Sequence, residues 1–160
     1  NPLSVFADGY GNGGALFSRL EGCWYADGAI YMNATDGGDA RCGQVWQYRP
    51  TSIDEGTLTL IYESPGREVL NSPDNLTVSP RGGLVLCEDA DSSFLRGLSP
   101  DGHIFDLAEN ILNGREFAGA CYSPDGRVLF VNIQGGNDPA LHGEPSMTFA
   151  IWGPWERGVL

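Results

Sequence analysis

The chain has 160 residues, enough for about one domain with a sizeable core, and its 23 glycines and 10 prolines exclude an all-helical bundle. Its hydrophobic content of 41% is too high for disorder, and its apolar runs are too short for a transmembrane helix, which needs about 20 residues. The net charge of −12 argues against a nucleic-acid partner or docking on an anionic membrane, since both attract clustered Lys and Arg. The same acidity suits either simple solubility or the binding of hard cations such as Ca2+.

The first 20 residues are rich in glycine and predict a loop with one strand near residues 15–19. A Gly-x-Gly-x-x-Gly string at Gly9, Gly11 and Gly14 follows no clear strand and opens no helix, so it predicts a flexible loop rather than a nucleotide site. No signal peptide is expected here, because no basic start precedes an apolar stretch.

A Ser-Pro-x-Gly element then recurs at residues 79–82, 99–102 and 123–126. It predicts a tight turn, because Pro presets φ at the first corner and Gly accepts a positive φ later. Each copy precedes a strand-like run, which is typical of hairpins. Ser79 and Ser123 are 44 residues apart with matching flanks. A period of about 40–50 residues that holds several short strands is typical of propeller blades.

The sequence therefore predicts an all-β fold of about three propeller blades. The expected blades cover residues 21–72, 73–115 and 116–160, the last without its fourth strand. The expected strands are residues 22–25, 29–35, 43–49, 57–63, 75–79, 83–88, 94–98, 103–108, 117–122, 127–134 and 146–152, with one helical turn within 106–113. Because propellers have about four to eight blades, we expect the C-terminal part of a larger propeller or one subunit of an oligomeric ring. A β-sandwich with repeated hairpins is the alternative.

The four cysteines are at least 19 residues apart and form no zinc or redox motif. Cys23, Cys87 and Cys121 lie in or beside apolar runs, so the sequence favours mostly buried thiols, with one structural disulfide as the alternative. His103 and His142 have no partner at metal-ligand spacing and are expected to be structural.

Three acidic residues precede the strands that would line a propeller channel: Glu21, Asp74 and Glu116. Their convergence at one channel mouth would make a cation site, whereas each alone would be an ordinary solvated carboxylate. Arg19 and Glu21 share a strand face, where an arginine can hold a phosphate while a carboxylate holds a metal; a surface ion pair is the alternative. The acidic run at residues 88–91 could bind Ca2+ but lacks the spacing of an EF-hand loop.

Three segments together resemble the PhoX-type alkaline phosphatases. They are RLEG at residues 19–22, SPDNLTVSPRGGL at 72–84, and EFAGACYSPDGRVLFVNIQ at 116–134. The resemblance runs from about Phe17 to Trp155, nearly the whole chain.

The resemblance implies a secreted bacterial phosphatase on a β-propeller, with iron and calcium ions at one end of the channel and phosphate esters as substrates. It implies that Arg19 contacts the substrate phosphate and that Glu21 and Glu116 are catalytic metal ligands, with Asp74 a further ligand.

The sequence also departs from the family pattern. None of the four cysteines matches the family's iron ligand, and full members are several times longer. We therefore expect the isolated chain to have little or no activity, with the rest of the propeller as a partner. The alternatives are a non-catalytic Ca2+-binding propeller module and a lactonase-like Ca2+-dependent hydrolase.

Overall fold

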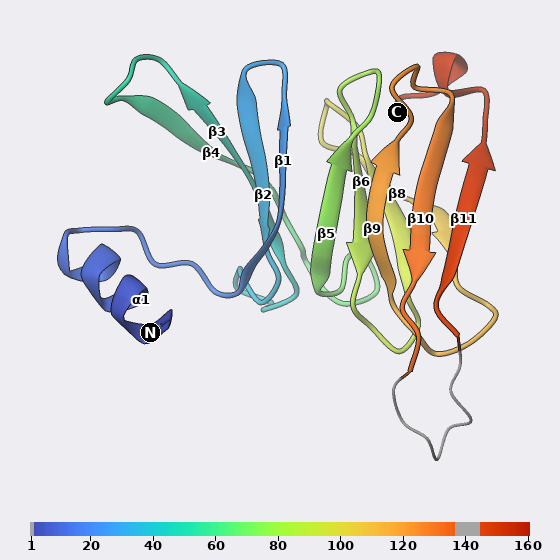
Figure 1. The fold of residues 1–160 in the computed structure, drawn as a ribbon, viewed down its shortest axis with the longest axis horizontal. Helices are drawn as coiled ribbons and strands as arrows, with labels where there is room; N and C mark the ends of the chain where they lie inside the picture. Colours follow the sequence, from blue (N-terminus) through green and yellow to red (C-terminus); the bar gives the residue numbers. More distant parts are fainter. Residues whose placement is uncertain (1, 137–144) are drawn as a thin grey trace.

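The computed structural model describes residues 2–136 and 145–160 and shows three antiparallel β-sheets with little helix (Figure 1). The first sheet has the order β1 (Leu20–Ala26), β2 (Ala29–Ala34), β3 (Gln44–Pro50), β4 (Gly56–Glu63). The second has the order β5 (Pro73–Val78), β6 (Leu84–Glu88), β7 (Phe94–Leu98), β8 (Ile104–Glu109). The third has the order β11 (Met147–Trp152), β10 (Val128–Ile133), β9 (Phe117–Tyr122), and the one-turn 3-10 helix Trp155–Arg157 follows it. The all-β prediction is confirmed.

The N-terminal loop prediction is wrong, because Pro2–Gly11 forms helix α1 and residues 15–19 form no strand. Proline is well tolerated in a first helical turn and glycine suits a helix end, so the glycines mark the end of this helix rather than a loop. Asn12 closes the helix, since its backbone N–H and its side-chain amide both donate to the carbonyl of Asp8 at 3.1 and 2.7 Å. No helix among the described residues is long and apolar enough to cross a membrane.

The three Ser-Pro-x-Gly elements form the predicted tight turns. In each, the glycine has a positive φ and its N–H donates to the serine carbonyl at 2.8–3.0 Å. These turns join β5 to β6, β7 to β8 and β9 to β10, so they set the hairpins from which the second and third sheets are built.

The predicted helical turn within residues 106–113 is absent, because β8 extends to Glu109. The loop after it is organised by Asn110. Its side-chain oxygen accepts from the N–H of Leu112 at 3.0 Å, and its amide donates to the carbonyl of Arg115 at 2.7 Å. An asparagine that bonds to nearby backbone in this way competes with helix formation.

The first strand of each sheet packs beside the first strand of the next, so β1 lies along β5 and β5 along β9. A Cβ on Gly22 would lie 2.9 Å from the Cα of Asn75, so the close approach of β1 to β5 requires glycine there. The side-chain oxygen of Asn75 accepts from the N–H of Ala120 at 3.1 Å and ties β5 to β9. One apolar core lies between the first and second sheets around Leu76 and Leu86, and another lies between the second and third.

All four cysteines are free thiols. Cys42 and Cys87 are buried and Cys121 is half-buried, whereas Cys23 is exposed, so the prediction of buried thiols holds for part of the set. Burial raises the pKa of Cys87 to about 12, which keeps this thiol protonated and unreactive.

Candidate metal centre

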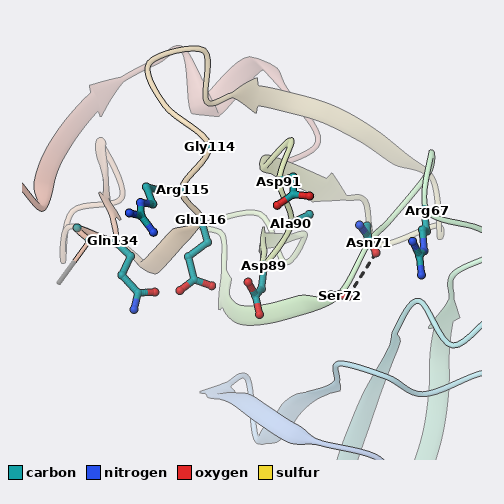
Figure 2. A pocket seen from close by; sticks show the side chains of 12 residues that line it. Arg67, Asn71, Ser72, Asp89, Ala90, Asp91, Gly114, Arg115, Glu116 and Gln134 are labelled. Carbon is teal, nitrogen blue, oxygen red and sulfur yellow. Dashed lines mark hydrogen bonds between the residues drawn. The ribbon is translucent and has the colours of Figure 1, made fainter. Parts of the chain in front are cut away.

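Three carboxylates converge where the second and third sheets meet: those of Asp74, Asp89 and Glu116. Each offers a ligand oxygen, and these oxygens lie within 4.8 Å of one another. Asp74 is the second residue of β5, Asp89 directly follows β6, and Glu116 directly precedes β9. Figure 2 shows the carboxylates of Asp89 and Glu116 pointing to the same side of the chain.

Irregular strand pairing accompanies the acids in all three sheets. In β1 the register with β2 shifts between Leu20 and Cys23, a stretch that contains Glu21. In β5 the register with β6 shifts around Asp74. In β9 two residues, Gly119 and Ala120, stand opposite one residue of β10. Side chains normally alternate between the two faces of a strand, and a bulge interrupts this alternation and redirects a side chain. The side chains of Glu21 and Asp74, in β1 and β5, therefore do not have to follow the regular alternation.

Arg19 lies over the same group of carboxylates. Its Nη2 is 2.8 Å from Oε1 of Glu21 and 3.9 Å from both Asp74 and Asp89. Its Nη1 is 3.5 Å from Asp36. The arginine side chain is 44% exposed, so these ion pairs add little to stability. They instead fix one positive charge above a group of negative charges and leave part of the guanidinium open to solvent.

The acids of this group do not titrate independently. Burial, together with the Glu21 carboxylate, raises the pKa of Asp74 to about 6. Burial and the nearby Asp89 raise the pKa of Glu116 to about 7. The pKa of Glu21 is lowered, first by its hydrogen bond with Asp74 and then by Arg19. Two carboxyl groups can share a hydrogen bond only when one carries a proton, so below about pH 6 Asp74 holds the proton of this pair and Glu21 is the anion.

This electrostatic situation favours a cation. Oδ1 of Asp74 is buried without a hydrogen-bond partner among the described residues, and three carboxylates at this spacing repel one another when all are ionised. Calcium takes carboxylate oxygens as ligands, so it would supply a partner for this oxygen and offset the repulsion between the carboxylates. Within residues 2–136 and 145–160 the converging group contains no cysteine or histidine, so these residues would offer an iron ion oxygen ligands only.

A cavity of about 570 Å3 opens beside Asp89 and Glu116 (Figure 2). Four loops line it, those after β4, β6, β8 and β10, and they contribute Arg67, Asp91, Arg115 and Gln134. Among the described residues, its wall contains no aromatic side chain and no aliphatic side chain larger than alanine. The space beside the carboxylates therefore suits a hydrophilic ligand.

The structure brings all four predicted site residues, Arg19, Glu21, Asp74 and Glu116, into one region. The prediction missed two members, Asp36 and Asp89. Asp89 belongs to the acidic run at residues 88–91, which already indicated a cation site, but its position opposite Glu116 depends on how the sheets pack. Of the histidines, His103 is exposed beside Asp101 at 3.1 Å, and His142 lies outside the described residues.

Comparison with known proteins yields one match. The family model described as Alkaline phosphatase PhoX matches residues 3–137, most of the chain. Neither the curated proteins nor the solved structures give a match.

Proposed function

The chain belongs to the alkaline phosphatase PhoX family, and from this premise we propose that it supplies metal-binding carboxylates and a phosphate-contacting arginine to a phosphoric-ester hydrolase. The observation that carries the proposal is the convergence of Asp74, Asp89 and Glu116 within 4.8 Å, with Arg19 beside them. Arg19, Asp74 and Glu116 lie in the three segments that resemble the family in sequence, whereas Asp89 lies outside them.

We propose that the three sheets are blades of a β-propeller whose channel is lined by β1, β5 and β9. The side-by-side packing of these first strands supports this arrangement, as does the position of the acids at their start. Further blades would come from additional propeller chain or from other copies of this chain. A secreted or periplasmic location follows from the family and belongs to the same proposal.

The residues present fit calcium directly and iron less specifically. Glu21, Asp74, Asp89 and Glu116 would hold the cations, and bound cations would supply charge that stabilises the phosphoryl group in the transition state. Arg19 would hold two phosphate oxygens through its planar guanidinium, a geometry that a lysine lacks. Glu21 would keep that guanidinium oriented through its bonds of 3.1 and 2.8 Å. The polar cavity would take the alcohol part of the ester.

Phosphate binding tests the proposal. Calorimetric titration with inorganic phosphate should show binding to the Ca2+-loaded chain and none to chelator-treated chain. Arg19→Gln should weaken this binding by about 10–150-fold, since a hydrogen-bonded contact to a charged group is worth about 1.5–3 kcal/mol, and Arg19→Lys should recover only part of it. Arg81→Gln is the matched control, because Arg81 is another exposed arginine and donates to the backbone carbonyl of Glu156 at 2.9 Å, away from the carboxylates.

Turnover of p-nitrophenyl phosphate should be slow or absent for the isolated chain. Calcium binding without any phosphate binding would contradict the phosphatase assignment and favour a non-catalytic Ca2+-binding module. Bound iron in the purified chain would support the family's metal composition against both a Ca2+-only module and a lactonase-like hydrolase.

A further inference from the structure

A buried ion pair lies directly behind the carboxylates. Glu88 ends β6 and is 1% exposed, and Arg96 in β7 is 5% exposed. Nε of Arg96 donates to Oε1 of Glu88 at 2.8 Å. The same guanidinium donates to Asp106 and lies 4.1 Å above the ring of Phe94. Burying two charges is costly, and apolar replacements of such pairs are often as stable, so stability alone does not account for this one.

The rest of the Glu88 carboxylate binds backbone on both sides of the candidate metal centre. The N–H of Asn71 donates to Oε1 at 2.8 Å, and the N–H of Phe94 donates to Oε2 at 3.2 Å. Asn71 stands three residues before Asp74, and Asp89 directly follows Glu88. One carboxylate at the end of β6 therefore binds the segment that enters β5 and the start of β7.

Ser93 extends this network to the third acid. Its hydroxyl donates to the carbonyl of Glu88 at 2.7 Å and accepts from the N–H of Phe117 at 3.0 Å. Phe117 directly follows Glu116, and Ser93 is 1% exposed. A continuous set of buried bonds thus reaches backbone next to or near each of the three converging acids.

We infer that Glu88, Arg96 and Ser93 are positioning residues that hold Asp74, Asp89 and Glu116 together for a cation. The inference rests on the proposed function of that site. The three acids repel one another, so a framework has to keep their backbones in place before a cation binds. Partners behind metal ligands commonly act in this way, and their loss typically lowers metal affinity about 10–100-fold.

Terbium, a luminescent stand-in for Ca2+, tests this inference in the full chain. Glu88→Gln keeps the shape and removes the charge, while Ser93→Ala removes only the hydroxyl. Leu98→Ala is the matched control, because Leu98 lies in the same strand as Arg96, is 2% exposed in the apolar core, and directly precedes the turn at residues 99–102, at the far end of the strand. The measurements are the Tb3+ affinity, the melting temperature, and the number of waters on the ion from luminescence lifetimes in H2O and D2O.

Both site variants should bind Tb3+ at least tenfold more weakly than the unmodified chain and leave more water on the ion. Leu98→Ala should lower the melting temperature without changing either quantity. If the site variants keep the affinity and water count of the control, the positioning role is wrong while the metal site stands. If the unmodified chain binds no Tb3+ and no Ca2+, the proposed metal site fails and this inference fails with it.

Discussion

Acidic residues at the two ends of the sheets stand in opposite environments. At the end where β5 and β9 begin, Asp74 and Glu116 are partly buried beside other carboxylates, and their pKa values rise to about 6 and about 7. The Ser-Pro-x-Gly turns lie at the other end of the sheets (Figure 1). Asp101 and Asp125 in these turns are exposed. The neighbouring serine hydroxyl donates to each turn carboxylate and lowers its pKa.

The difference separates two uses of the same residue type. Each turn acid accepts a hydrogen bond from the serine of its own turn and is exposed to water, so its anion is stabilised without a cation. The acids at the other end are not satisfied as anions by the protein alone, and a cation completes them.

The largest expected effect is on calcium affinity. Glu116→Gln removes one of three converging carboxylates, and we expect Ca2+ to bind roughly 100-fold more weakly, the upper end of the loss found for mere outer-shell partners. Asp125→Asn removes a carboxylate of the turn end and should leave the affinity unchanged. Isothermal titration calorimetry measures the Ca2+ affinity of both variants. Equal losses in the two variants would mean that overall acidity, and not convergence, attracts the ion.

The next effect is on thermal stability. A ligand at about 100 times its dissociation constant stabilises the folded state by about 2.7 kcal/mol, which raises the melting temperature by about 5–10 °C for a chain of this size. Adding Ca2+ to chelator-treated chain should therefore produce such a rise in differential scanning calorimetry. Glu116→Gln should lose most of the rise, and Asp125→Asn should keep it. A rise of the same size in both variants would place the ion elsewhere.

The sheets and their turns were predictable because their determinants are local. Each Ser-Pro-x-Gly turn is followed by an apolar run, and the observed hairpins follow that order.

The site was predictable only in part. Glu21, Asp74 and Glu116 precede recurring turns, but Asp89 meets Glu116 only because β6 and β9 pack together, across 27 residues of sequence. The bulge at Asp74 depends on pairing with β6, so no local pattern reveals it. Helix α1 was missed because its glycines lie at the helix end, where they are favourable.

The pH dependence of stability should have opposite signs at the two ends. The pKa values of Asp74 and Glu116 are raised in the folded state, so their contribution to stability is complete below about pH 4 and is lost as the pH rises through 6 to 7. The pKa values of Asp101 and Asp125 are lowered in the folded state. Their contribution to stability is therefore present at pH values above the ordinary pKa of an aspartate and is lost as the pH falls below it. Melting temperatures of chelator-treated chain between about pH 2 and 8 measure both, and Glu116→Gln should flatten the decline above about pH 5. Calcium should also release protons when it binds near pH 6.5, because it displaces them from these acids. Binding with no proton release would show that the acids are already ionised.

The smallest expected effects compare a glycine at each end. A Cβ on Gly22 would meet the backbone of Asn75 and Leu76 at 2.9 Å, so Gly22→Ala has to push β1 away from β5 at a cost of about 1–3 kcal/mol. A Cβ on Gly102 would meet nothing within 4 Å, and Gly102→Ala carries only the penalty of its φ of +87°, about 1 kcal/mol. Chemical denaturation measures both losses. Calcium affinity then distinguishes their origin, since displacing β1 moves Glu21 and Arg19 away from Asp74, whereas a strained turn at the far end leaves them in place. A Gly22→Ala variant with unchanged Ca2+ and phosphate affinities would exclude Glu21 and Arg19 from the site and confine it to Asp74, Asp89 and Glu116.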